Sequence, residues 1–335
     1  VDSYIKATAK LATSNSDLKV VYSAMHGVGT KTLEQVFAAA NFAPPILVME
    51  QAEPDPDFPT VKFPNPEEPG AIDLSIKKAM QVSADLVIAN DPDADRCAVA
   101  IADRGGNWRM LRGDEVGAIL GEYLARAAKD KNAALANSIV SSSILSKIAK
   151  AYQLPFAETL TGFKWIAKIE NLNFGYEEAL GYAVDSNSVN DKDGISAALM
   201  IVQIATDLKR ESKTLNDFLD EIWSKYGYHG TKQISVRVDS VEQIATILGR
   251  FRNNTPQSIA GYRVIGFDDL EKPLSGLPPT NGVRIFLEPK IRIIVRPSGT
   301  EPKIKCYIEV VSDNQEKAEE IIQGLDLELR TLLAS

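Results

Sequence analysis

The chain has 335 residues, with 37 lysines and arginines against 45 aspartates and glutamates, which leaves a formal net charge of -8. A hydrophobic fraction of 44% and a charged fraction of 24% exclude a disordered, collagen-like or coiled-coil chain. The acidic balance argues against a nucleic-acid partner, no apolar run is long enough to cross a membrane, and two cysteines predict a cytoplasmic location without a disulfide framework.

The N-terminus carries no initiator methionine and no signal-peptide pattern. It opens with Val1-Asp2-Ser3-Tyr4, as if partway through a helix. We therefore expect the chain to be a fragment, with Tyr4–Leu11 as a connector helix. Because a fragment can expose a docking face, self-association as a dimer is also expected.

Residues 1–104 alternate short apolar runs with helical stretches, which predicts an α/β domain. The predicted strands are Lys19–Tyr22, Ile46–Met49, Asp85–Ala89 and Cys97–Ala102, and the predicted helices are Thr30–Ala40 and Asp73–Val82. The Pro-rich passage Glu53–Pro69 cannot form regular structure and is predicted to be a surface crossover.

Residues 105–226 repeat this pattern, and residues 227–335 change to strands joined by short turns, which indicates an antiparallel sheet. The second segment has predicted helices at Gly113–Lys129, Ser143–Tyr152, Gly194–Lys209 and Thr214–Tyr226, and a predicted strand at Ser138–Val140. The third has strands at Gln233–Val238, Arg263–Phe267, Val283–Leu287, Ile291–Arg296 and Lys303–Val311, and helices at Val241–Asn253 and Asn314–Leu333. We predict two consecutive three-layer α/β domains with mixed sheets (1–104 and 105–226), followed by a smaller α+β C-terminal domain with an antiparallel sheet (227–335).

An acidic loop follows the predicted strand Asp85–Ala89. Its carboxylates, Asp91, Asp93 and Asp95, alternate along the chain and can converge on one cation, and hard oxygen ligands suit Mg²⁺. The next residue, Arg96, suits a phosphate. An EF-hand loop is excluded because its sixth and twelfth positions would be Arg96 and Ala102. A phosphatase with Asp91 as nucleophile and a solvated acidic turn stay open as alternatives.

A second loop, Arg296–Lys303, joins two apolar strands near the C-terminus. It combines the hydroxyls of Ser298 and Thr300 with the exposed backbone of Gly299 and a basic residue at each end. This is the composition of a phosphate-binding loop built without a helix, although a plain turn is the alternative.

Three weaker signals lie in the first two segments. Glu177 and Glu178 stand between glycines, where a carboxylate can accept hydrogen bonds from sugar hydroxyls, or simply form an exposed turn. Lys164 and Lys192 follow glycine- and aspartate-containing turns and can face an anion, or be surface lysines. The turn around His26 lacks the spacing of a P-loop and predicts only a tight strand-to-helix connection.

Together and in this order, the acidic, Glu-Glu and Ser-Gly-Thr loops resemble those of the α-D-phosphohexomutase superfamily, the phosphoglucomutases and phosphomannomutases. The resemblance extends from His26 to Lys303 and implies that this chain corresponds to domains two, three and four of a four-domain enzyme. It implies Mg²⁺ ligands at Asp91, Asp93 and Asp95, and contact of Arg96 with the reacting phosphoryl group. It further implies a sugar-binding role for Glu177 and phosphate binding by Arg296, Ser298, Gly299, Thr300 and Lys303. Gly162, Lys164 and Lys192 match active-site positions of the third domain, and Lys164 is the candidate general base.

For the complete protein, the resemblance implies interconversion of hexose 1-phosphate and hexose 6-phosphate. A phosphoserine would donate and recover the phosphoryl group, with glucose 1,6-bisphosphate as activator and intermediate. The sequence departs from the family pattern at two points. Ala179 stands where many members have serine, and in this it resembles the phosphoglucomutase-2-like branch. The Ser-His pair of the family's phosphoserine loop does not occur in these 335 residues. The fragment is therefore expected to be inactive without an N-terminal serine domain as its partner. The alternatives are a phosphomannomutase, a phosphopentomutase, or a serine-less protein that binds sugar phosphates.

Overall fold

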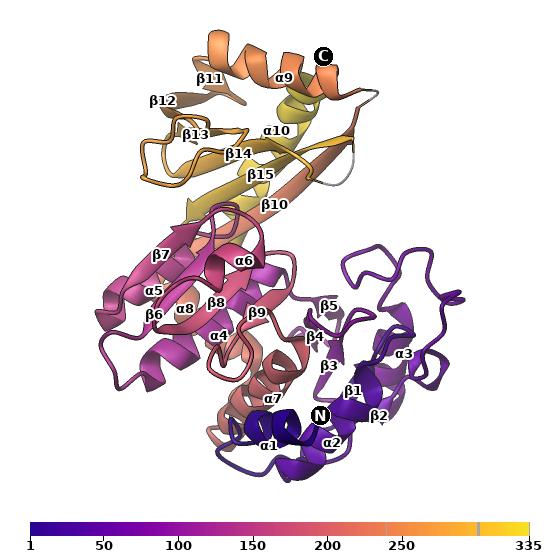
Figure 1. Ribbon diagram of the computed structural model, residues 1–335. Helices are drawn as coiled ribbons and strands as arrows, with labels where there is room; N and C mark the ends of the chain where they lie inside the picture. Colours follow the sequence, from indigo (N-terminus) through magenta and orange to yellow (C-terminus); the bar gives the residue numbers. More distant parts are fainter. Residues whose placement is uncertain (239, 300–301, 335) are drawn as a thin grey trace. The chain divides into compact units, whose positions relative to one another are not determined.

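The computed structural model describes residues 1–238, 240–299 and 302–334, and within the helix at 241–253 the side chain of Val241 is not described. The chain divides into unit 1, which is Val1–Ser141 with Leu145–Ile222, and unit 2, which is Ser142–Ile144 with Trp223–Ser335. Unit 1 contains two β-sheets and unit 2 contains a third (Figure 1). Among the described residues, no helix combines the length and apolarity that a membrane crossing requires.

The first sheet of unit 1 has the strand order β2-β1-β3-β4-β5. Its strands are β1 (Val20–Ser23), β2 (Ile46–Leu47), β3 (Leu86–Ala89), β4 (Ala98–Ala102) and β5 (Trp108–Met110). Its helices are α1 (Asp2–Ala9), α2 (Gly29–Ala39), the short 3-10 helix η1 (Met49–Gln51) and α3 (Asp73–Val82). β1 pairs in parallel with β2 and β3, whereas the β3–β4 and β4–β5 pairs are antiparallel. The sheet is therefore mixed, and the strands that bury all four residues, β1 and β3, lie at its centre.

The second sheet of unit 1 has the order β7-β6-β8-β9 and is also mixed. Its strands are β6 (Ala134–Ser138), β7 (Phe156–Thr159), β8 (Leu172–Glu177) and β9 (Gly181–Ala183). Its helices are α4 (Gly113–Ala127), α5 (Ile144–Tyr152), α6 (Phe163–Ile166), α7 (Gly194–Arg210) and α8 (Leu215–Tyr226). The predicted strand Ser138–Val140 is wrong, because pairing ends at Ser138 and a turn follows. The sequence does not indicate β6, because its alanine and asparagine residues have low β-propensity, although all five residues of the strand are buried.

Unit 2 holds one antiparallel sheet, in the order β10-β15-β14-β13-β12-β11. Its strands are β10 (Tyr228–Arg237), β11 (Ser258–Ile259), β12 (Tyr262–Asp269), β13 (Val283–Leu287), β14 (Ile291–Pro297) and β15 (Lys303–Ser312), and its helices are α9 (Val241–Asn253) and α10 (Gln315–Ala334). Alternate strand residues such as Ile293, Ile304 and Ile308 join the core under α9 and α10. The intervening residues, among them Arg292 and Glu309, therefore point to the opposite face.

The predicted fold class is confirmed: two α/β domains with mixed sheets precede a C-terminal domain with an antiparallel sheet. The Pro-rich passage contains no helix or strand between residues 54 and 69, as expected. The domain boundaries at 104/105 and 226/227 stay a prediction.

Candidate functional site

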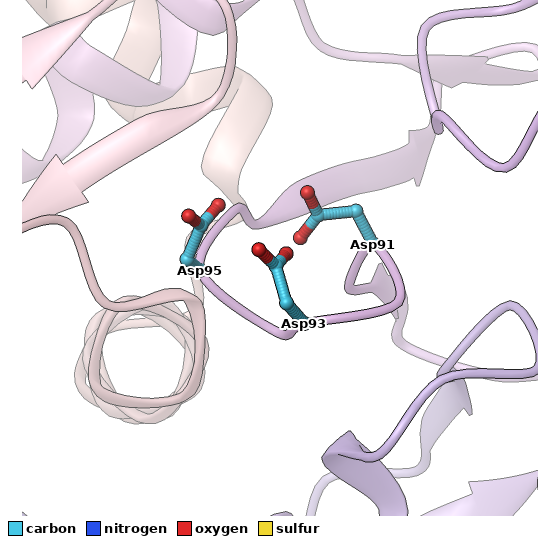
Figure 2. Close-up of side chains that lie close together, drawn as sticks. All are labelled: Asp91, Asp93 and Asp95. Atoms are coloured by element: carbon cyan, nitrogen blue, oxygen red, sulfur yellow. The ribbon is translucent and has the colours of Figure 1, made fainter. Parts of the chain in front are cut away.

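The acidic loop leaves the carboxyl end of β3 and gathers three carboxylates. One oxygen from each of Asp91, Asp93 and Asp95 lies within 4.8 Å of the others. Figure 2 shows the three side chains leaving one loop with their carboxylates close together. Asp91 is buried, Asp95 is half-buried and Asp93 is exposed, so the cluster is open to solvent on one side. An open set of hard oxygen ligands is what a Mg²⁺ ion with exchangeable waters requires.

Two buried side chains beneath the loop hold its shape. The Asn90 side-chain amide donates to the carbonyl oxygen of Arg96 at 2.5 Å, and the Tyr22 hydroxyl donates to the Asn90 side-chain oxygen at 2.8 Å. The backbone N–H of Arg96 donates to Asp91 Oδ1 at 3.0 Å, which closes the loop on itself. Sequence reasoning missed Asn90 and Tyr22, because a buried polar residue is recognisable only once its neighbours are known.

The electrostatics of the loop are dominated by crowded negative charge. Burial raises the pKa of Asp91 to about 6; the Asp95 and Asp93 carboxylates add to the rise, and hydrogen bonding from the Arg96 backbone opposes it. The Arg96 guanidinium lies 3.5 Å from Asp91 Oδ2 and 3.9 Å from Asp95 Oδ1. Carboxylates packed this closely repel one another, so a cation is favoured among them.

Gly27 packs against the outside of the same loop. A Cβ atom at this position would lie 2.2 Å from the Pro92 Cα, and the next residue, Val28, donates its N–H to the Pro92 carbonyl at 2.9 Å. We expect Gly27→Ala to lower the free energy of unfolding by about 3 kcal/mol, because the backbone at either position 27 or Pro92 must shift to make room for the Cβ atom. Gly249→Ala, in α9 where a Cβ meets no atom within 4 Å, should instead stabilise by up to about 1 kcal/mol. Urea denaturation of both variants measures this, and equal effects would contradict the packing argument.

The turn between β8 and β9 is joined directly to the acidic loop. Arg96 forms an isolated antiparallel bridge with Gly181, and the Cys97 N–H donates to the Leu180 carbonyl at 3.0 Å. Glu177 is the last residue of β8, directly before this turn, so the predicted sugar-binding glutamate and the predicted metal loop lie in one region of unit 1. Glu177 Oε1 also accepts the N–H of Gly162 at 2.7 Å.

Lys192 lies against the acidic loop, whereas Lys164 does not contact it. The Lys192 ammonium forms an ion pair with Asp95. A cavity of about 270 Å³ opens there; its lining includes Tyr4, Val28, Asp93, Asp95 and Lys192. Lys164 is exposed on α6, with its Nζ atom 5.9 Å from the centre of the Trp165 ring.

Asp193, the neighbour of Lys192, has two structural roles. Its carboxylate caps α7 by accepting the N–H groups of Ile195 and Ser196. It also accepts the Tyr4 hydroxyl at 2.9 Å, which ties α1 to the segment carrying Lys192. No spacing in the sequence indicates this contact, because Tyr4 and Asp193 are 189 residues apart.

The Ser-Gly-Thr loop belongs to unit 2, where it joins β14 to β15. Arg296 and Lys303 are half-buried at its two ends, and the Ser298 N–H donates to the Lys303 carbonyl at 2.8 Å. Gly299 is exposed. Thr300 lies outside the described residues.

Comparison with protein families gives three matches in chain order. Residues 2–106 match the family described as "Phosphoglucomutase/phosphomannomutase, alpha/beta/alpha domain II", residues 112–226 match domain III of the same family, and residues 234–323 match its C-terminal domain. These ranges contain the acidic loop, the Glu177 turn and the Ser-Gly-Thr loop respectively.

Curated relatives are similar over most of this chain but are longer. A Haemophilus influenzae protein named "Probable phosphomannomutase" is 46% identical, over 99% of this chain and 68% of its own length. A phosphoglucomutase of Staphylococcus haemolyticus is 37% identical, over 96% of this chain and 63% of its own length. A mouse phosphopentomutase is 37% identical, over 88% and 53%.

Two solved structures have the same fold. Parafusin, a phosphoglucomutase from Paramecium, superposes with a TM-score of 0.72 at 22% identity, covering 99% of this chain and 60% of its own. The N-acetylphosphoglucosamine mutase of Aspergillus fumigatus, solved with GlcNAc-6P and magnesium, gives 0.57 at 15% identity, over 98% and 65%.

Proposed function

This chain belongs to the α-D-phosphohexomutase superfamily, and we propose that it supplies the metal, sugar and phosphate sites of a phosphomutase. The enzyme would interconvert a sugar 1-phosphate and the same sugar carrying its phosphate on the terminal carbon. The observation that supports the proposal is the bridge between Arg96 and Gly181, which joins the three-carboxylate loop to the turn that follows Glu177. A cation site and a polyol-binding carboxylate side by side are what phosphoryl transfer on a sugar needs.

The acidic loop fits Mg²⁺ by its donor chemistry. It offers three carboxylates within 4.8 Å of one another and no nitrogen or sulfur ligand, the set that magnesium prefers. Asp91, Asp93 and Asp95 would hold the ion, which when bound would offset charge on a phosphoryl oxygen. Lys192 would share the Asp95 carboxylate with the ion, because its ammonium group already forms an ion pair with Asp95.

The chain's own residues then have separate tasks. Arg96, held by carboxylates on both sides, would contact the transferring phosphoryl group. Glu177 would accept hydrogen bonds from sugar hydroxyls and so orient the ring. In unit 2, Arg296, Ser298, Gly299, Thr300 and Lys303 would bind the phosphate that is not transferred. Lys164 would act as the general base, and its exposed position leaves its amine accessible to a ligand.

We propose a hexose phosphate as substrate, with a pentose phosphate as the alternative. The relatives at 37% identity include both a phosphoglucomutase and a phosphopentomutase, so the identities do not separate the two. Ala179 bears on the choice, because the serine hydroxyl common in the superfamily is replaced there by a methyl group. One fewer hydrogen bond to the sugar ring favours a site that tolerates more than one sugar.

The phosphoryl donor in this proposal is a phosphoserine on a separate serine domain, with glucose 1,6-bisphosphate as activator. The 335 residues contain no Ser-His pair for such a loop, whereas the Staphylococcus and mouse relatives extend well beyond the matched region. The same lack of a Ser-His pair favours a second candidate, a protein that binds sugar phosphates without turnover. The expected dimer and the cytoplasmic location stay predictions.

The test is a coupled assay of glucose 1-phosphate conversion to glucose 6-phosphate, with Mg²⁺ and catalytic glucose 1,6-bisphosphate. We expect turnover from the full-length gene product and none from this chain alone, which should still bind glucose 1-phosphate. In the full-length product, Arg296→Ala should raise KM roughly tenfold or more, because a charge-assisted phosphate contact is lost. Binding without turnover in both forms would favour the second candidate, and the absence of binding would overturn both.

A further inference from the structure

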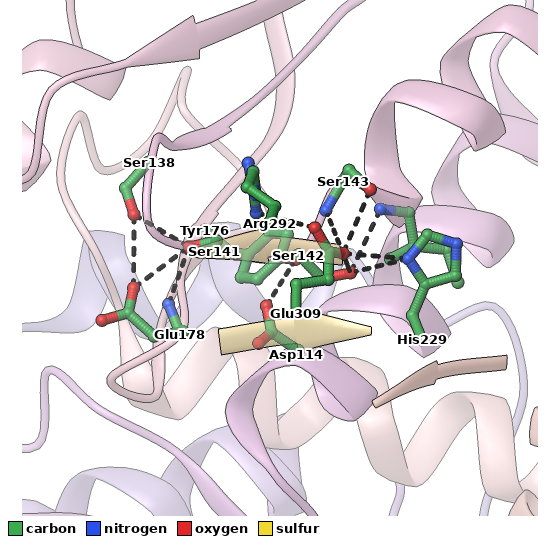
Figure 3. A network of polar contacts seen from close by, with 11 residues as sticks. Asp114, Ser138, Ser141, Ser142, Ser143, Tyr176, Glu178, His229, Arg292 and Glu309 are labelled. Carbon is green, nitrogen blue, oxygen red and sulfur yellow. Dashed lines mark hydrogen bonds and ion pairs between the residues drawn. The ribbon is translucent and has the colours of Figure 1, made fainter. Parts of the chain in front are cut away.

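Glu178, the neighbour of the proposed sugar-binding residue, is held in a closed ring of hydrogen bonds. Its N–H donates to Ser141 Oγ at 3.0 Å, and the Ser141 hydroxyl donates to Glu178 Oε2 at 3.1 Å. The Ser138 hydroxyl donates to the same oxygen at 3.2 Å and lies 2.8 Å from Ser141 Oγ. Both serines are fully buried: Ser138 ends β6 and Ser141 lies in the turn that follows, and Figure 3 shows both facing the Glu178 carboxyl. The ring therefore ties the turn to the end of a central strand.

The backbone of Glu178 is fixed from the other side by α4. A Cβ atom on Gly113, the first residue of that helix, would lie 1.8 Å from the Glu178 carbonyl oxygen. Two residues later, Leu180 adopts a φ of 65° and accepts the Cys97 N–H. Glu178 is thus the point where the turn is held by contacts to its side chain and its backbone alike, directly beside Glu177.

We propose that Glu178 is a positioning residue, which sets the direction of the Glu177 carboxylate toward the sugar by anchoring the turn to Ser138 and Ser141. This inference rests on the proposed function, because it assumes that Glu177 contacts the sugar. Glu178 itself touches no substrate in this account. An error of about 1 Å in the placement of a binding group can cost up to roughly a hundredfold in activity, so an anchor of this kind has a measurable effect.

Ionisation of Glu178 should make sugar-phosphate affinity depend on pH, an effect that a purely structural role of this residue would not produce. Burial raises the pKa of Glu178 to about 7, and the Asp114 carboxylate on α4 and the Glu177 carboxylate on the turn add to the rise; hydrogen bonding to its own backbone and to Ser141 opposes it. The Tyr176 hydroxyl, on β8, donates to Asp114 at 2.9 Å. Above pH 7 the ionised carboxyl adds a negative charge beside Glu177, which disfavours an anionic sugar phosphate. Below pH 7 this charge is absent.

The experiment compares the affinity of this chain for glucose 1-phosphate, by calorimetry with Mg²⁺ at pH 6 and pH 8.5, between wild type and two variants. Glu178→Ala breaks the ring and should weaken binding roughly tenfold or more at pH 6. Glu178→Gln keeps the size and the hydrogen-bond acceptor, so it should match wild type at pH 6 and bind about fivefold more tightly at pH 8.5, where only wild type gains the charge. Comparison at each pH cancels the ionisation of the ligand's own phosphate.

Two control variants and the wild-type measurement distinguish failure of the proposed function from failure of the positioning role of Glu178. Glu170→Gln removes an exposed charge in the same unit and should leave affinity unchanged at both pH values. Glu177→Ala should weaken binding at both. If wild type fails to bind glucose 1-phosphate at millimolar concentrations, the proposed function fails and this inference with it. If wild type binds and Glu178→Ala binds equally well, or Glu178→Gln follows the wild-type pH dependence, the positioning role alone is overturned.

Discussion

Asp93→Asn is expected to weaken Mg²⁺ binding at least about a hundredfold and to remove the mutase activity of the full-length product. Asp93 is the exposed member of the three-carboxylate cluster, and no hydrogen bond or ion pair is recorded for it among the described residues. Its replacement should therefore leave the loop intact while removing one of the three proposed anionic ligands. Loss of an outer-shell partner alone typically costs 10–100-fold in metal affinity, so loss of a direct ligand should cost at least the upper value.

Titration calorimetry with Mg²⁺ measures the first effect, and thermal unfolding should show unchanged stability. Asp313→Asn is the matched control: it makes the same chemical change at an exposed position outside the acidic loop and should leave metal affinity at its wild-type value. Asp91→Asn is less informative, because Asp91 also accepts the Arg96 N–H and shapes the loop. Wild-type Mg²⁺ affinity in Asp93→Asn would exclude the three-carboxylate site.

The second large effect is expected at Glu309, in unit 2. This buried carboxylate pairs with Arg292 at 2.9 Å and with His229 Nδ1 at 2.9 Å. It also accepts the hydroxyls of Ser142 and Ser143 and the N–H of Ser143 at the start of α5 (Figure 3). Glu309→Ala would leave the half-buried Arg292 charge without this carboxylate and the helix start without its acceptor. We expect a loss of about 3–5 kcal/mol in the free energy of unfolding.

Urea denaturation measures this loss, and the surface ion pair of Arg252 with Glu271 is the control. Glu271 is half exposed, so Glu271→Ala should cost less than about 1 kcal/mol. Burial alone would raise the pKa of Glu309, but Arg292 and His229 outweigh it and lower the pKa below its ordinary value of 4.5. The stabilisation is therefore complete above pH 4.5 and is lost as the pH falls below it. Equal costs for the two variants would show that the buried network contributes little.

Much of the fold was predictable because its elements follow local rules. The helix limits at Asp73–Val82 and Val241–Asn253, and the strand Val283–Leu287, agree with the structure to the residue. Each has a clear periodicity and is bounded by turn residues. The errors lie where local preference opposes the fold: three of the five residues of β6 are alanine or asparagine, and the three-residue β5 is too short to show a pattern.

For the candidate site, local sequence determined the chemistry and tertiary structure decided the arrangement. The spacing of Asp91, Asp93 and Asp95 places three carboxylates on one loop, and in the structure one oxygen of each lies within 4.8 Å of the others. No spacing could show that Lys192 pairs with Asp95, 97 residues away, or that Leu180 accepts the Cys97 N–H. Such contacts depend on how two sheets pack, and packing is set by the whole core rather than by neighbours in sequence. The order of residues is therefore enough to identify the chemical groups and the family that they indicate, whereas the contacts between those groups depend on the folded core.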